Sequence, residues 1–302
     1  MNTMPEAMQV GSGQHGVPRW LLGGGAPVLL SGLVPPQEAR QLTARLRLTP
    51  IYEAEAADIG LSALASAPTP AAGLRGAPCW DAVMVDGKLW QVVEVFGGAV
   101  SQLSLAGPKG EESFDLSDQG VSLCMPRFQR GGSGVLLAAA DPQSGRIWTM
   151  VPGGKPQPAG SGIQPLCVSG PGGNWLLSLR QVAGHRSPTG DPAGVLQIAP
   201  LSARGAANGA SLLAGLARPI WDFDADFGPD GRLYVLAAWR GGLELLAGSP
   251  EGLDKRLSVI GIPVLHPALA VTSEGCHLAY SRLSGGTIVG TELVAVPPEA
   301  LR

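Results

Sequence analysis

The segment Trp221–Gly252 shows a hydrophobic pattern that recurs along most of the chain. Apolar and acidic residues alternate up to Phe227, as in a strand with one buried face. A Pro-Asp-Gly turn follows, and glycine-rich turns then separate three further apolar stretches, Leu233–Ala238, Leu243–Ala247 and Leu257–Ile260. Four short antiparallel strands joined in this way predict one blade of a β-propeller.

The same unit recurs between residues 79 and 297. Each copy carries a glycine in its first strand turn, about 40 to 60 residues after the previous one, which is the spacing of four-stranded blades. These glycines are Gly87, Gly134, Gly173, Gly231 and Gly275. Residues 26–66 add strand-like segments for most of another blade. We therefore predict an all-β fold, a single six-bladed propeller of four-stranded antiparallel blades, with five blades as the alternative. A strand from residues 27–66 is expected to pair with Thr287–Val296 and close the ring.

The N-terminal part of the chain has two interpretations. Trp20–Val34 is apolar and has the length of a signal-peptide core, while a membrane span needs about twenty residues. Residues 1–34 are then a disordered or leader-like segment before a propeller domain of residues 35–302, and export to the cell envelope is preferred over a cytoplasmic location. The alternative is an apolar first strand at Pro27–Leu33.

Composition narrows the function classes. The 21 basic residues are scattered and the net charge is −3, so there is no basic surface for nucleic acid. The 45% hydrophobic content argues against disorder, and 44 glycines with 27 prolines suit a fold with many tight turns. None of the four cysteines forms a C-x-x-C pair, and we expect them to be unpaired core thiols.

One copy of the repeat carries a family resemblance. The run FGPDGRLYVLAAWRGGLELL (residues 227–246) resembles the repeat of TolB-like (PD40, WD40-like) propellers, with weaker copies at Met125–Met150 and Leu265–Val296. The resemblance implies a six-bladed propeller, often exported and often bound to protein partners. The amino-terminal domain that accompanies the propeller in TolB is not evident in this sequence, which puts a TolB-type envelope role in doubt.

Candidate chemistry is concentrated in the acidic strand that carries Asp222, Asp224 and Asp226. A calcium loop of the EF-hand type fails, because Phe227 and Leu233 stand where its glycine and glutamate belong. We therefore expect these carboxylates to face solvent and predict no metal site. No G-x-S-x-G nucleophile motif is present, and the four histidines are isolated in the sequence.

A quinoprotein-like stretch, Asp141–Trp148, occurs only once, so we interpret it as a turn between strands. It leaves a sugar-binding or quinone-dependent propeller as a third, weaker reading.

Two function classes remain from the sequence. The preferred hypothesis is a non-catalytic scaffold, monomeric on its own and without a cofactor or a transmembrane span, whose loops bind a protein partner. Its expected binding residues lie in a turn, in the longest polar loop and on the acidic strand: Trp239, Arg240, His185, Arg186, Asp222 and Asp224. The alternative is a lactonase-like, metal-dependent hydrolase with its site in the central channel. That hypothesis requires two or more of Asp222, Asp224, His266 and Arg127 to meet at the channel mouth.

Overall fold

The fold was examined in a computed structural model. It describes residues 8–10, 18–21, 28–33, 45–50, 57–60, 80–96, 100–209, 211–214, 216, 218–284, 287–297 and 300. The elements of these residues are β-strands, together with the 3₁₀ turn η2 (Ser117–Gln119). Within these residues no helix is long and apolar enough to cross a membrane.

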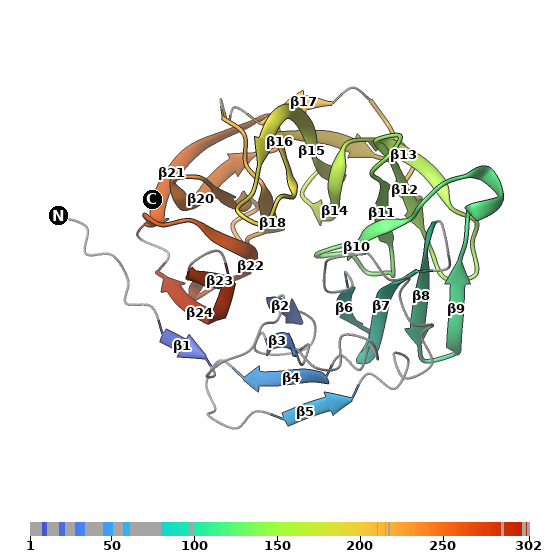
Figure 1. Ribbon diagram of the computed structural model, residues 1–302, viewed down its shortest axis with the longest axis horizontal. Helices are drawn as coiled ribbons and strands as arrows, with labels where there is room; N and C mark the ends of the chain where they lie inside the picture. The colour runs from blue at the N-terminus through green and yellow to red at the C-terminus, as the bar shows by residue number, and fades with distance from the viewer. Residues whose placement is uncertain are drawn as a thin grey trace.

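Five four-stranded antiparallel sheets form the blades of a β-propeller around a central channel (Figure 1). The first blade contains β6 (Trp80–Val85), β7 (Lys88–Phe96), β8 (Ser101–Gly107) and β9 (Gly110–Phe114). The second contains β10 (Cys124–Phe128), β11 (Leu137–Asp141), β12 (Arg146–Met150) and β13 (Gln157–Ser161). The third contains β14 (Ile163–Gly170), β15 (Gly173–Arg186), β16 (Pro192–Leu201) and β17 (Leu212–Leu213).

The fourth blade is the unit that the hydrophobic pattern predicts most clearly, and the prediction is confirmed. It contains β18 (Asp222–Phe227), β19 (Leu233–Trp239), β20 (Gly242–Ser249) and β21 (Gly252–Ile260). Every residue of β19 except Trp239 is buried, because neighbouring blades cover both faces of the sheet. The hydrophobic core therefore lies between successive blades.

The fifth blade joins the two ends of the chain. It contains β22 (Val264–Thr272), β23 (Gly275–Ser284) and β24 (Thr287–Val296), and its fourth strand is β1 (Met8–Val10). The expected closure by a strand from residues 27–66 is wrong, since Met8 pairs with Leu293 in this ladder. The physical purpose is the same, because a strand from the start of the chain covers the open edge of the last blade.

Residues 18–60 supply a further four-stranded antiparallel sheet in the order β2 (Pro18–Leu21), β3 (Val28–Leu33), β4 (Arg45–Pro50) and β5 (Ala57–Gly60). In Figure 1 this sheet lies between the first and the fifth blade. Strands β3 and β4 pair with each other across the expected domain boundary at residue 34.

Two smaller predictions concern cysteines and turns. Three cysteines, Cys124, Cys167 and Cys276, are free thiols, whereas Cys79 lies outside the described residues. The Asp141–Trp148 stretch is a turn between β11 and β12, in which the carboxylate of Asp141 accepts hydrogen bonds from Ser144 and the backbone N–H of Gln143.

Candidate functional site

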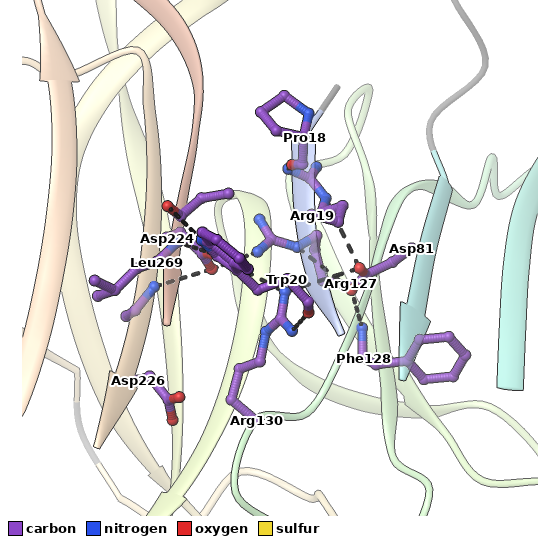
Figure 2. Close-up of polar contacts among 12 residues, drawn as sticks. Pro18, Arg19, Trp20, Asp81, Arg127, Phe128, Arg130, Asp224, Asp226 and Leu269 are labelled. Carbon is purple, nitrogen blue, oxygen red and sulfur yellow. Dashed lines mark hydrogen bonds and ion pairs between the residues drawn. The ribbon is translucent and has the colours of Figure 1, made fainter. Parts of the chain in front are cut away.

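The inner strands of the propeller bring a cluster of charged side chains into the central channel. Arg19 comes from β2, Asp81 from β6, Arg127 from β10 and Asp224 from β18, while Arg130 lies two residues after the end of β10 (Figure 2). Both aspartates are fully buried, and Arg130 is 1% exposed. Buried charges of this kind are stable only when they are paired.

Two carboxylates and three guanidinium groups lie close together in the middle of the channel. Arg127 Nη2 lies 2.5 Å from Asp224 Oδ1, and Arg127 Nε lies 3.6 Å from Asp81 Oδ2. Arg130 Nη2 stands between the same aspartates, 3.9 Å from Asp81 Oδ1 and 4.0 Å from Asp224 Oδ2. Arg19 Nε lies 3.8 Å from Asp81 Oδ1. We call these five residues the channel cluster.

Each aspartate of the channel cluster also ties one blade to the next. Asp81 Oδ2 accepts a hydrogen bond of 2.8 Å from the backbone N–H of Phe128, and Asp224 Oδ2 accepts one of 2.8 Å from Leu269. The equivalent geometry in two blades indicates a structural role. Burial would raise the pKa of Asp224, but Arg127 and Arg130 outweigh it and hold the pKa below its ordinary value.

The other two aspartates of β18 have a different chemistry. Asp222, Asp224 and Asp226 share one face of the strand, since side chains alternate with a period of two. Burial raises the pKa of Asp222 to about 6, against the opposing charges of Arg19 and Arg127. Burial also raises the pKa of Asp226 to about 7, and in Figure 2 this side chain lies apart from the channel cluster. Asp222 is half-buried, and it is the least buried of the three carboxyls of this strand.

The expectation that these three carboxylates face solvent is wrong. Asp224 is fully buried and Asp226 is 6% exposed. The alternation of β18 is real, and Phe223 does pack in the core, but β18 is the innermost strand of its blade. Its polar face therefore lines the channel.

A repeated bulge shapes the start of three inner strands. Met125, Gln164 and His266 have φ values of 56°, 51° and 48°, each precedes a proline, and the ladder shifts register at each position. Positive φ is uncommon outside glycine, and bulges re-aim side chains. The bulge therefore changes the direction of one side chain in each of β10, β14 and β22.

His266 is the titratable side chain that this bulge presents. Its Nδ1 lies 3.2 Å from Ser281 Oγ. Burial lowers the pKa of His266 to about 4, the charge of Arg19 adds to this effect, and Asp191 opposes it. His266 is therefore a neutral imidazole at pH 7. The charge of Arg19 thus acts on both Asp222 and His266.

The predicted loop residues fall into two groups. His185, Arg186 and Arg240 line one cavity of about 360 Å³ together with Trp221. Trp239 is half-buried and does not line this cavity. The guanidinium of Arg218 stacks on its ring, 3.6 Å from the centroid. The structure thus brings three of the predicted residues together and keeps Trp239 out of that group.

Sequence reasoning found part of the channel. Arg127 and Asp224, two of the four residues that the hydrolase hypothesis requires to meet, are in direct contact. Arg19, Asp81 and Arg130 were missed. The signal that could have found them is a single charged residue within an apolar strand, as in Trp80-Asp81-Ala82-Val83. A strand face that points to solvent carries polar residues at every second position, and this stretch does not.

The described side chains do not form a group suited to a metal ion. No group of three or more His, Cys, Asp or Glu side chains suited to a metal ion occurs in the described part of the chain. The oxygens of Asp81 and Asp224 are already engaged by guanidinium and backbone N–H groups.

The fold and the lined channel define the class: the chain is a β-propeller protein. No protein-family model matches its sequence, and a search of curated proteins finds no match.

Solved structures do match. A protein of unknown function from Dyadobacter fermentans has a TM-score of 0.63 at 11% identity, over 97% of this chain and 99% of that one. A mutant α-L-arabinofuranosidase from Fusarium graminearum, bound to an iminosugar inhibitor, has a TM-score of 0.63 at 11% identity, over 95% and 94%. The GH43_1 enzyme from Xanthomonas citri in complex with xylose has a TM-score of 0.53 at 16% identity, over 97% and 90%.

These comparisons correct the preferred sequence hypothesis. The expected non-catalytic scaffold is overturned, because solved propellers that the chain resembles are enzymes, and they favour an enzymatic propeller. At this level of identity the likeness establishes the fold, so the chemistry has to be argued from the residues of this chain.

Proposed function

We propose that the protein is a hydrolase whose active site lies at the mouth of the central channel. The observation that carries the proposal is Asp222 on β18, a half-buried carboxyl with a pKa raised to about 6, together with the neutral His266 on β22, since the charge of Arg19 acts on both. Pairs of titratable groups whose environments push their pKa values apart are typical of acid and base assignments.

Asp222 and His266 have different roles in the proposed reaction. Protonated Asp222 donates its proton to the leaving oxygen of the substrate. His266 accepts a proton from the attacking water through Nε2, while Nδ1 faces Ser281 Oγ and fixes the ring. The channel cluster holds the site rigid from below. In this scheme side chains perform both proton transfers, and no metal takes part.

The substrate class that we propose is a glycoside. Two of the solved propellers described above are glycosidases or hold a sugar, and a carboxylic acid with a raised pKa is the general acid that glycoside hydrolysis uses. Esters and lactones are the second class, since the same acid and base suit acyl transfer.

The test is a pH profile of turnover. Purified full-length protein is assayed on chromogenic glycosides, esters and lactones, and the product is analysed for ¹⁸O after reaction in H₂¹⁸O. Hydrolysis incorporates the label, whereas elimination does not. For the cleaved substrate, kcat/KM is expected to rise with a pKa of about 4 from His266 and fall with a pKa of about 6 from Asp222.

The variants Asp222→Asn and His266→Ala separate the two limbs. Asp222→Asn should remove the upper limb and His266→Ala the lower one, each with a large loss of rate. Asp118→Asn, an exposed carboxyl on η2, is the matched control. Full activity in both site variants would contradict the proposal.

We also propose that β2–β5 are a sixth blade of a TolB-like ring and that Trp20 is retained in the mature protein. Trp20 is fully buried, its Nε1 donates to the carbonyl of Ala268 on β22, and its neighbour Arg19 pairs with Asp81 on β6. The sheet thus bonds to both adjacent blades. Intact-mass analysis of the native protein checks this, because cleavage near residue 34 would remove both side chains.

Binding of a protein partner and a monomeric state stay predictions, which affinity capture and light scattering would test.

A further inference from the structure

The cavity lined by His185, Arg186 and Arg240 carries positively charged side chains, whereas the protein as a whole has a negative net charge. The chain has a net charge of −3, yet the ten residues that line this cavity include two arginines and a histidine and no carboxylate. Arg240 is exposed and has no ion pair or side-chain hydrogen bond among the described residues. A concave site with unneutralised guanidinium groups is suited to an anion.

The hairpin between β15 and β16 fixes one of these guanidinium groups. Arg186 Nη1 donates a hydrogen bond of 2.6 Å to the carbonyl of Gly190, which leaves its other N–H groups free. The one carboxylate of the hairpin, Asp191, is turned into the turn itself and accepts hydrogen bonds from Ser187 and Thr189. The hairpin therefore holds a carboxylate oxygen of Asp191 in hydrogen bonds within the turn, while His185 and Arg186 line the cavity.

The walls of the cavity connect it to the proposed active site. Pro219 and Trp221 line the cavity directly before Asp222 at the start of β18. Pro263 lines it directly before β22, the strand that carries His266. The indole of Trp221 is fixed by a hydrogen bond of 2.9 Å from Nε1 to the carbonyl of Val264. The cavity thus lies against the residues that precede the two strands carrying Asp222 and His266, although neither of these two side chains lines it.

We propose that this cavity is the subsite for an anionic group of the substrate, held by Arg186 and Arg240. The inference rests on the proposed hydrolase for its role in turnover, but binding itself does not depend on it. The ligand class is a small molecule with a carboxylate or a phosphate, of a size that about 360 Å³ admits. An acidic sugar combines this anion with the glycoside chemistry proposed above.

Binding of defined probes tests the proposal. The probes are glucuronate, glucose 6-phosphate and glucose, titrated by calorimetry or ligand-observed NMR into the full-length protein. At least one of the two anions is expected to bind, more tightly at low salt, and neutral glucose at least tenfold more weakly. Preference for glucuronate identifies a carboxylate subsite, and preference for glucose 6-phosphate a phosphate subsite.

Variants locate the binding. Arg186→Ala and Arg240→Ala should each weaken the bound anion at least tenfold, and Arg204→Ala, an exposed arginine on the outer side of the same blade, should not. Glucose that binds as well as either anion, or anion binding that survives the double variant Arg186→Ala/Arg240→Ala, would overturn the subsite. Asp222→Asn separates the two proposals, because it should retain anion binding while turnover falls.

Discussion

Asp222 and Asp224 lie two residues apart on the same face of one strand, and their chemistry is opposite. Asp224 is fully buried, contacts Arg127 at 2.5 Å and accepts a backbone hydrogen bond from Leu269. Asp222 is half-buried, and its pKa is raised to about 6. A step of about 7 Å along the channel therefore separates a carboxylate that holds the blades together from one that is poised to transfer a proton.

The difference comes from the number of neutralising groups and not from depth alone. Burial disfavours the charge on both residues. At Asp224, Arg127 and Arg130 outweigh that effect, while at Asp222 the opposing charges of Arg19 and Arg127 are too weak to do so. The arginines of the channel thus lower the pKa of Asp224 and leave the pKa of Asp222 raised.

The largest expected effect is on stability, at Asp224. Asp224→Asn removes the carboxylate that neutralises Arg127, and leaves a buried guanidinium without its closest partner. We expect the free energy of unfolding to fall by about 3–5 kcal/mol, measured by urea denaturation. Asp81→Asn should behave in the same way, because its backbone tie to Phe128 has the same geometry. A loss below about 1 kcal/mol in both variants would show that the channel cluster does not stabilise the propeller.

The next effect is on turnover, at Asp222. Asp222→Asn is expected to lower kcat/KM about 100-fold or more, because it removes the general acid. The free energy of unfolding should stay within about 1 kcal/mol, since no strong ion pair is lost. Activity and urea denaturation are measured on both Asp222→Asn and Asp224→Asn. If the two variants destabilised the protein equally, Asp222 would have the same structural role as Asp224.

A smaller, pH-dependent effect is expected at Asp226. Its folded-state pKa of about 7 lies above the ordinary value of 3.8, so the folded protein binds the proton more tightly than the unfolded chain. Its contribution is therefore present at low pH and is lost as the pH rises from about 4 through about 7. Asp226→Asn removes this dependence.

The measurement is the difference in unfolding free energy between the variant and the wild type, followed from pH 4 to pH 8. The difference should shift in favour of the variant by about 4 kcal/mol over this range, because the two pKa values are about three units apart. Asp118→Asn, at an exposed carboxyl, should show no such shift. A flat difference at Asp226 would mean that this carboxyl ionises normally in the channel.

The blade architecture was accessible from sequence because its signals are local. Period-two alternation, the Pro-Asp-Gly turn and the apolar run at Leu233–Ala238 lie within one blade, and the strands form where these signals place them. The pairing of β1 with β24 was not accessible, because it joins residues almost 300 positions apart and several strands could have served. Arg19, Asp81 and Arg130 escaped for the same reason, since the channel cluster comes from several sheets and its members meet only when the ring closes.

The smallest expected effect contrasts a surface arginine with a channel arginine. Arg218 stacks on Trp239 and pairs with Glu244, but its side chain is 30% exposed, whereas that of Arg127 is 7% exposed. Solvent reaches Arg218 and screens its pair with Glu244 more than it screens the pairs of Arg127. We therefore expect Arg218→Ala to lower the free energy of unfolding by about 1 kcal/mol or less, and Arg127→Ala by about 3 kcal/mol or more. Urea denaturation of both variants, with Trp239→Ala to isolate the stacking interaction, checks the order. Equal destabilisation by Arg218→Ala and Arg127→Ala would contradict this prediction. It would show that burial does not decide how much an ion pair stabilises this propeller.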